Sequence, residues 1–269
     1  MIILDLDIDY FIKKVAFGIP ESSHARLSEV EYGSELWEEY DIREFLESKL
    51  HLLTSKRIKG RVVTHHNEAI DFWEGLIKDG NLTVPFNVVH IDSHADLGLG
   101  TNGGAYLSME LLKHPVNERR RMCRRINAQG KSYKEGIGDY LLFAIAYRWI
   151  DKLVYCGNPN EECNDYDISI LKDFKEKSFH GGIADNIIQL KYNPYSEWPN
   201  PYTDEDGEVE EYLKKCIFEP EIPYRIIRNP ENIDMKIPFD YAVISQSPNY
   251  TPESADSILG IIKEYIEII

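Results

Sequence analysis

The chain has 269 residues, and its 46 acidic against 30 basic side chains give a formal net charge of −16 at pH 7. This charge disfavours a general binder of nucleic acid or of anionic membranes and suits a cationic partner. A hydrophobic content of 43% and an aromatic content of 12% indicate a packed globular chain with a substantial core, and they exclude a disordered acidic chain.

The cysteines and the hydropathy of the chain indicate in which cellular compartment the protein resides. The four cysteines form no CxxC pair, and the chain opens on the acidic segment MIILDLDID rather than on a basic flank with a long apolar run. No uncharged stretch approaches the roughly 20 residues needed to span a bilayer. We therefore predict a reduced, cytoplasmic protein without a membrane segment.

Short apolar runs alternate with helical patterns along the chain. Strands are predicted at 2–6, 61–64, 87–91, 152–156 and 241–245, helices at 68–79, 139–151 and 254–269, and loops at 98–104, 157–166 and 193–207. This alternation is typical of a mostly parallel sheet covered by helices on both faces. We expect one three-layer α/β/α domain spanning residues 1–269.

The first strand carries the acids Asp5, Asp7 and Asp9, which alternate with apolar residues. Like charges on one face resist ionising unless a cation neutralises them, so a metal ion is a natural counterion. The alternative is a solvent-facing edge strand with its acids turned outward.

The second predicted strand passes into a helix through His65 and His66. Either imidazole could reach the sheet edge where the strands end. A lone histidine at a helix start is more often a capping or packing residue, so this element gains weight from its neighbours.

The third strand ends in the D-x-H-x-D pattern of Asp92, His94 and Asp96. Side chains at i, i+2 and i+4 of an extended segment point the same way, and ligands of open α/β sheets bind at this end of the strands. Two carboxylates with one imidazole suit a divalent ion such as Mn²⁺. The alternative is a polar turn. Three strand ends with such groups together favour a metal site.

These segments resemble a known superfamily. HIDSHADLG is similar to the D-A-H-A-D signature of the arginase and histone-deacetylase superfamily, HHNEA to its histidine strand end and LDLDIDYF to its D-x-D strand end. The D-x-D element and the segment SPNYTP resemble the branch that includes peptide arginases, which convert arginine residues of ribosomal peptides to ornithine. In free-arginine enzymes the D-x-D strand follows the D-A-H-A-D strand, whereas here it comes first, as in a circular rearrangement.

The resemblance implies a binuclear Mn²⁺ centre in which Asp92 bridges the two ions. The implied metal ligands are Asp7, Asp9, His66, Asp92, His94 and Asp96. Spacing leaves two alternatives open, because Asp5 with Asp7 could replace Asp7 with Asp9, and His65 could replace His66. His90 would lie deeper in the strand, as a supporting or core residue.

The implied reaction is hydrolysis of a guanidinium group. Two divalent ions roughly 3.5 to 4 Å apart lower the pKa of a shared water, which can attack the planar carbon and release urea and ornithine. Asp96 and His94 are the predicted catalytic residues, with Asp96 as the proton carrier.

Two departures concern the substrate. A shuttle histidine of free-arginine enzymes is missing from the segment 102–108, so proton shuttling there must use Tyr106, water or nothing. Their E-V-N-P element is replaced by Ser245, Gln246, Ser247 and Pro248. We predict that Tyr106, Ser245 and Gln246 contact an arginine-containing precursor peptide, without naming the acid that pairs with the guanidinium. The alternatives are a metal-dependent amidohydrolase or deacetylase of the same fold, and a non-catalytic metal-binding peptide-interaction protein.

Overall fold

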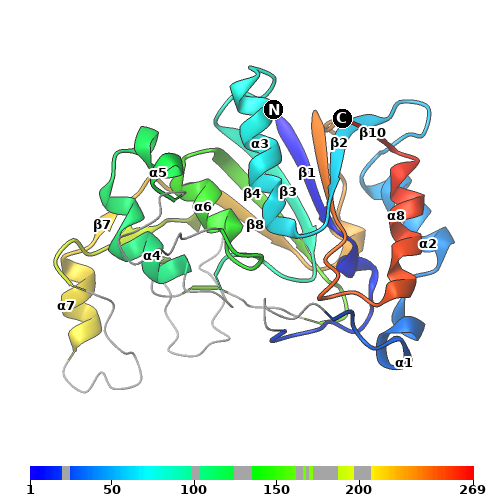
Figure 1. Cartoon of the computed structure of the whole chain (residues 1–269), viewed down its shortest axis with the longest axis horizontal. Coiled ribbons are helices and arrows are strands. Elements are labelled where there is room, and N and C mark those ends of the chain that lie inside the picture. Colours follow the sequence, from blue (N-terminus) through cyan, green and yellow to red (C-terminus); the bar gives the residue numbers. More distant parts are fainter. Residues whose placement is uncertain are drawn as a thin grey trace. The chain divides into compact units, whose positions relative to one another are not determined.

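The computed structural model describes residues 1–19, 25–98, 103–123, 135–161, 166–167, 170–171, 187–196 and 207–269. Eight strands form one sheet in the order β10-β2-β9-β1-β3-β4-β8-β5, and β6 pairs with β7 separately (Figure 1). The strands are β1 Ile2–Asp7, β2 Ile58–Val63, β3 Phe86–Asp92, β4 Ile150–Gly157, β5 Ile187–Ile188, β6 Lys191–Tyr192, β7 Ile217–Phe218, β8 Ile222–Ile227, β9 Tyr241–Ser245 and β10 Ile266–Ile268.

The predicted fold class is confirmed, because the large sheet is mostly parallel and helices accompany it. Strands β1, β3, β9, β2 and β10 pair in parallel, whereas β5 and β8 pair antiparallel. The α-helices are α1 Glu29–Tyr32, α2 Glu39–Glu44, α3 Ala69–Lys78, α4 Gly103–Met109, α5 Val116–Cys123, α6 Tyr140–Ala146, α7 Glu208–Lys214 and α8 Asp256–Lys263. The circular rearrangement of strand order stays a prediction.

Two predicted helices are shorter than their patterns suggested. The helix expected at 139–151 ends at Ala146, where Arg148 adopts a positive φ of 58° and β4 begins two residues later. The helix expected at 254–269 ends at Lys263, and the apolar residues beyond it form β10. In both cases an apolar run joins a helix to a strand without a change in composition.

The chain forms two compact units. The first contains Met1–Ala95, Asp151–Cys163 and Arg225–Ile269, and the second contains Asp96–Ile150 and Asn164–Tyr224. The expectation of one domain over 1–269 stays a prediction.

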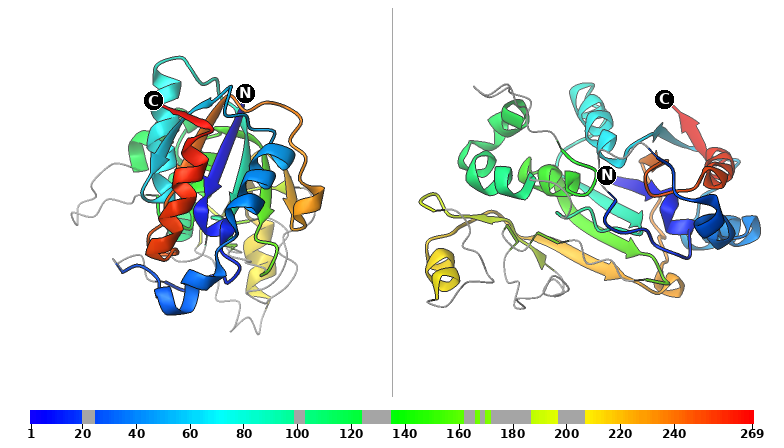
Figure 2. Two further views of the ribbon diagram at one scale, coloured as in Figure 1. Left: turned by 90° about the vertical axis from the view of Figure 1, so that its right-hand side faces the viewer. Right: turned by 60° about the horizontal axis from the view of Figure 1, so that its bottom comes forward.

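In the first unit, β1 separates two environments by the alternation of its side chains. Leu4 and Leu6 are buried in one core cluster together with Ile42 of α2 and Ile258 of α8. Helix α3 lies on the opposite side of the sheet from α2 (Figure 2), where its Trp73 packs edge-on against the Phe86 ring. Strand β1 is central rather than an edge strand, so the outward-facing alternative for its acids is wrong.

The second unit contains a buried ion pair. Arg119 is buried, and its guanidinium donates to both carboxylate oxygens of Glu219 at 2.7 and 3.0 Å. Arg148 donates to the same carboxylate at 3.1 Å. Buried charges are tolerated when they are paired in this way, so these residues hold the unit together rather than form an open site.

The parallel register brings four strand ends to one edge of the first unit. Asp5 of β1 pairs with His90 of β3, and Asp7 pairs with Ser245 of β9, which in turn pairs with Val63 of β2. The carboxyl ends of these strands therefore lie side by side, at the edge where open α/β sheets bind ligands.

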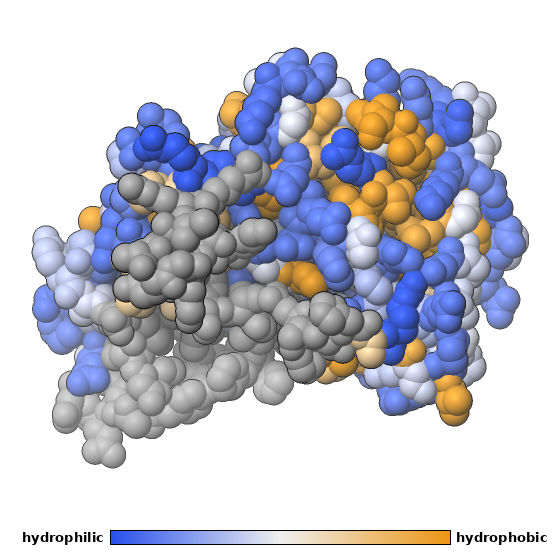
Figure 3. Space-filling model, viewed as in Figure 1, coloured by the Kyte–Doolittle hydropathy of each residue, from blue (hydrophilic) through white to orange (hydrophobic). Residues whose placement is uncertain are grey.

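Hydrophilic residues dominate the face in Figure 3, and hydrophobic ones gather near β10, where Ile268 and Ile269 are exposed. Among the helices of the described ranges, none is long and apolar enough to cross a membrane.

Candidate metal centre

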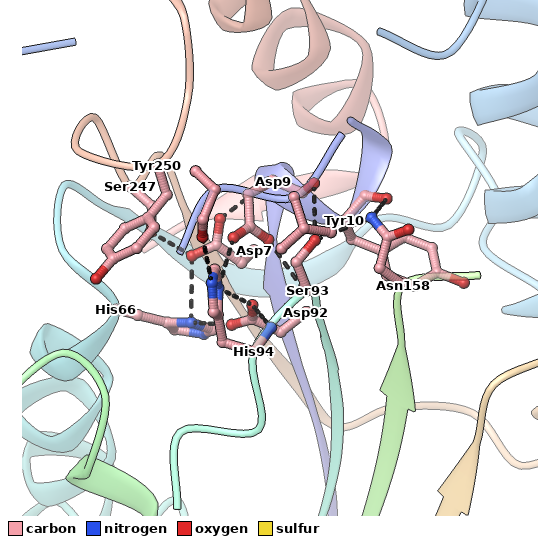
Figure 4. A network of polar contacts seen from close by, with 12 residues as sticks. Asp7, Asp9, Tyr10, His66, Asp92, Ser93, His94, Asn158, Ser247 and Tyr250 are labelled. Carbon is pink, nitrogen blue, oxygen red and sulfur yellow. Dashed lines mark hydrogen bonds and ion pairs between the residues drawn. The ribbon is translucent and has the colours of Figure 1, made fainter. Parts of the chain in front are cut away.

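Five acidic and histidine side chains converge at the carboxyl edge of the central strands. They come from the last residues of β1 and β3, from the short helices η1 (Ile8–Phe11) and η4 (His66–Glu68), and from the turn after β3. Figure 4 shows their carboxylates and imidazoles pointing toward one another. The five are Asp7, Asp9, His66, Asp92 and His94. The expected convergence of three strand ends is therefore observed.

These side chains form two groups that share one carboxylate. Ligand atoms of Asp7, His66 and Asp92 lie within 4.8 Å of one another, and so do those of Asp9, Asp92 and His94. Each group could hold a metal ion, and Asp92 offers one oxygen to each. His66 Nδ1 lies 2.8 Å from its Oδ2, and His94 Nδ1 lies 3.5 Å from its Oδ1. The two groups thus lie on either side of the Asp92 carboxylate.

The His66 ring is held from behind by a second carboxylate. Its Nε2 lies 3.1 Å from Asp5 Oδ1, whereas its Nδ1 lies 2.8 Å from Asp92 and 3.3 Å from Asp7. Because a carboxylate accepts a hydrogen bond, Asp5 favours a proton on Nε2 and leaves Nδ1 able to bind a metal. A metal-binding histidine usually donates its other N–H to a carboxylate or carbonyl in this manner.

The His94 ring has the same arrangement with a different partner. Its Nε2–H donates to the Ala16 carbonyl at 2.9 Å, and its Nδ1 lies 3.0 Å from Asp9 Oδ2. A carbonyl can only accept, so Nε2 carries a proton, and Nδ1 is the ring nitrogen that faces Asp9 and Asp92 and could bind a metal once it is deprotonated. Both histidines thus present Nδ1 to the carboxylates, which fits the donor set of a divalent metal centre.

The geometry favours His66 and the pair Asp7 with Asp9 over their alternatives. Asp5 uses one oxygen for His66 and the other for His90 Nδ1 at 3.1 Å, so it supports the rings. His65 is the N-cap residue before η4, where its backbone N–H donates to Glu68, and only His66 joins the cluster.

His90, interpreted as a supporting or core residue, lies beside the cluster, and with Asp5 and His66 it also forms a group that could hold a metal. Its supporting role stays a prediction. His90 is fully buried, with Nδ1 facing Asp5 and Nε2 3.1 Å from the carbonyl oxygen of His94. Because that carbonyl requires a donor, Nε2 carries a proton and has no lone pair for a metal. His90 joins the strand β3 to the turn that carries His94.

Burial and the charges of neighbouring groups shift the pKa values of Asp9 and His66. Burial raises the pKa of Asp9 well above its ordinary value, and the charges of Asp7 and Asp92 add to this rise. Burial disfavours charge on His66, yet the carboxylates around it, Asp5 above all, raise its pKa well above the ordinary value. Without a metal the cluster therefore retains protons on groups that a divalent cation would deprotonate.

The other two carboxylates are held in the ionised form by histidines. Burial opposes ionisation of Asp92, but hydrogen bonds from His66 and His94 hold its pKa well below the ordinary value. For Asp5 burial is likewise outweighed by His66 and His90, and its pKa is also lowered. An ionised Asp92 is the form that could bind a metal ion.

Two supporting contacts escaped the sequence analysis. Ser247 Oγ donates to Asp7 Oδ2 and lies 2.7 Å from Ser245 Oγ, and it adopts a positive φ of 43°. Ser93 N–H donates to Asp9 Oδ1 at 3.1 Å, and Asn158 Nδ2 donates to Ser93 Oγ at 3.0 Å. The segment SPNYTP was a signal for Ser247, whereas no sequence signal pointed to Asn158.

Four predicted site residues lie outside the two ligand groups described above. Ser245 is fully buried at the end of β9, and Gln246 Nε2 donates to Asp256 Oδ1 at 2.8 Å. Asp96 is buried with a positive φ of 52° and is the first residue of the second unit. Tyr106 lies on α4 of that unit and stacks on Phe143. Their proposed roles with substrate and proton stay predictions.

Part of the sequence interpretation concerns residues outside the described ranges. These are Asn102 and Cys163, together with 99–102, 162–165 and 197–206 of the expected loops. Among the described cysteines, Cys123, Cys156 and Cys216 are free thiols, and burial raises the pKa of Cys156 to about 12. That thiol is therefore protonated and unreactive near neutral pH.

Comparisons of the chain with protein-family models, with curated proteins and with solved structures find no match.

Proposed function

We propose that the protein is a cytoplasmic binuclear manganese hydrolase that converts arginine residues of a ribosomally made peptide to ornithine and releases urea, a post-translational modification. The observation that carries the proposal is Asp92, which is common to two ligand groups that each contain one histidine. A single-ion site has no need of a second group of this kind, whereas a pair of ions that share a water requires a bridging ligand.

The donor set favours manganese. Carboxylate oxygens predominate, which suits hard ions, while the Nδ1 atoms of His66 and His94 favour a transition metal over Mg²⁺ or Ca²⁺. Zinc hydrolases typically use three protein ligands richer in nitrogen or sulfur. The metal-dependent deacetylase or amidohydrolase alternative would require a mononuclear zinc site, and the second group around Asp9 speaks against it.

Two divalent ions in this cluster would supply an acidified water for attack on a guanidinium carbon at neutral pH. The chain's own residues position the reaction. Asp5 and the Ala16 carbonyl fix the two imidazoles, Ser247 and Ser93 orient the carboxylates of Asp7 and Asp9, and Asp96 is the proposed proton carrier. Proton delivery to the departing amine gives ornithine and leaves urea.

The substrate assignment depends on the sequence resemblance and on charge. Hydrolysis of a guanidinium is proposed because several segments are similar to those of peptide arginases. A cationic peptide is proposed because it suits the net charge of −16. The non-catalytic alternative draws support from Ser245 and Gln246, whose side chains bond within the protein.

The test uses purified protein loaded with Mn²⁺ and either free arginine or a peptide that contains one arginine. We expect urea and a peptide product in which arginine has become ornithine, detected by mass. Turnover of free arginine alone would refute the peptide assignment. Two bound equivalents of Mn²⁺ without urea from either substrate would favour the peptide-interaction protein instead.

A further inference from the structure

His94 marks the accessible side of the metal cluster. Its side chain is 14% exposed, whereas those of Asp7, Asp9, His66 and Asp92 are at most 4% exposed. The Ala16 carbonyl accepts its Nε2–H, so the segment beside Ala16 borders this opening. A ligand that reaches the cluster within the first unit therefore passes the His94 ring.

Two aromatic rings contact His94 at this opening. The Tyr250 ring lies edge-on with its centroid 4.8 Å from the imidazole, and the Phe17 ring lies at 6.1 Å with an interplanar angle of 79°. Figure 4 shows Tyr250 beside Ser247 at the margin of the cluster. Phe17 is 50% exposed, so half of a large apolar side chain faces outward next to an otherwise buried charged site.

Two divalent ions would offset the negative charges of Asp7, Asp9 and Asp92, so the loaded centre would attract a cation less strongly than the empty cluster. The chain also lacks an acid at Ser245 or Gln246, and Gln246 is bonded to Asp256. A cationic side chain therefore needs recognition by groups that attract positive charge without contributing a carboxylate. Aromatic faces do this, and guanidinium groups stack on them especially well.

We propose that Phe17 and Tyr250 form an aromatic mouth that binds the cationic side chain of the substrate and directs its guanidinium toward the metal cluster. The proposal depends on the proposed function for the identity of that side chain. Tyr250 is tied to the same border, because its hydroxyl donates to the Ile19 carbonyl at 3.4 Å. Among the described residues, the two rings thus flank His94, the most exposed of the five clustered side chains, from two distant segments of the chain.

The test compares Phe17→Leu and Tyr250→Leu with the wild-type protein, all loaded with Mn²⁺. For a peptide with one arginine, we expect each variant to raise KM about 2- to 5-fold, the range of an exposed cation–π contact, with kcat and Mn²⁺ content unchanged. Phe17→Tyr keeps an aromatic ring at this position and should therefore have the wild-type KM. Tyr195→Leu, which removes a highly exposed tyrosine of the second unit, is the matched control.

A second measurement does not depend on hydrolysis. Two peptides are compared by equilibrium binding, one with lysine and one with uncharged norleucine at the same position. The difference in affinity reports preference for a cation, and neither peptide can release urea. We expect the wild-type protein to prefer the lysine peptide and both leucine variants to lose that preference. Preference that survives in both variants, or is absent from the wild type, would overturn the aromatic mouth. Absence of urea with an intact, ring-dependent preference would refute the proposed function alone.

A charge-based alternative is tested by Glu161→Gln. Glu161 accepts the Val15 N–H at 3.2 Å and so lies against the segment that borders the opening. Glutamine keeps an acceptor oxygen but removes the charge. An unchanged KM and cation preference in this variant support recognition by the rings, whereas a loss equal to that of the leucine variants would assign recognition to the carboxylate.

Discussion

The Nδ1 atom of His66 lies 2.8 Å from Oδ2 of Asp92, although His66 begins the short helix η4 and Asp92 ends the strand β3. The opposite nitrogen of the same ring faces Asp5. One imidazole thus separates a carboxylate that orients it from a carboxylate that would share a metal with it. This order of groups gives the site several properties that can be measured.

Asp5 should control metal affinity without being a ligand. In Asp5→Asn the amide cannot accept from both His66 and His90, so His66 loses its orientation. We expect affinity for one of two Mn²⁺ ions to fall about 10- to 100-fold while the stoichiometry remains two. Titration calorimetry with Mn²⁺ measures both, and Asp79→Asn on the surface is the control. Equal loss at both sites would show that Asp5 is a ligand.

Loss of the Asp92 charge should reduce the amount of bound Mn²⁺ more than loss of either histidine. Asp92→Asn removes the charge from both ligand groups, whereas His94→Ala removes one nitrogen from one group. We expect the asparagine variant to retain no tightly bound Mn²⁺ and the alanine variant to retain one equivalent. Metal content after gel filtration distinguishes them. One equivalent in Asp92→Asn would mean that the two groups do not share this carboxylate.

Metal binding should release protons and strengthen as pH rises. The raised pKa values of Asp9 and His66 mean that both groups hold protons in the metal-free protein which a cation must displace. Calorimetry in buffers of different ionisation enthalpy counts the released protons. A count of zero near pH 7 would contradict this account.

The same groups set the pH dependence of stability without metal. His66 has a raised pKa in the folded state, so its stabilising contribution is complete below about pH 6.5 and fades as pH rises through its folded value. Asp9 acts in the same direction, and Asp5 and Asp92, whose pKa values are lowered, lose their contribution only in acid. Chelator-treated protein should therefore melt at a lower temperature at pH 8.5 than at pH 6. Mn²⁺-loaded protein should not show this fall.

Ser247 should stabilise the cluster through Asp7. Ser247→Ala removes the hydroxyl that Asp7 Oδ2 accepts and leaves Ser245 without its partner, at an expected cost of about 1–3 kcal/mol. Ser245→Ala keeps the bond to Asp7 and should cost less. Urea denaturation of chelator-treated protein measures both values, and the reverse ranking would show that Ser245 is the principal support.

Much of the fold could be predicted because the central strands are short, apolar and bounded by polar residues. The runs at 2–6, 87–91 and 241–245 are β1, β3 and β9 almost to the residue. The extent of the helices at 139–151 and 254–269 could not be predicted, because apolar helix and apolar strand follow each other there and periodicity does not separate them.

The convergence of the site could be predicted from parallel strand ends, but the role of each acid could not. Asp5, Asp7 and Asp9 are equivalent in the sequence, and the partners of each histidine nitrogen distinguish them. Contacts such as that of Ser247 with Asp7 join residues 240 positions apart, so no local pattern reveals them.

Because side chains of β1 alternate between two faces, the strand cannot tolerate the insertion or deletion of a single residue. Its even positions, Leu4 and Leu6, fill the core, and its odd positions, Asp5 and Asp7, face the histidines. An insertion or deletion of one residue near Ile3 would exchange the two sets and bury carboxylates in the core while leucines met His66. An insertion or deletion of two residues would keep the leucines in the core and the carboxylates beside the histidines. Evolution or engineering of this strand can therefore proceed only in steps of two.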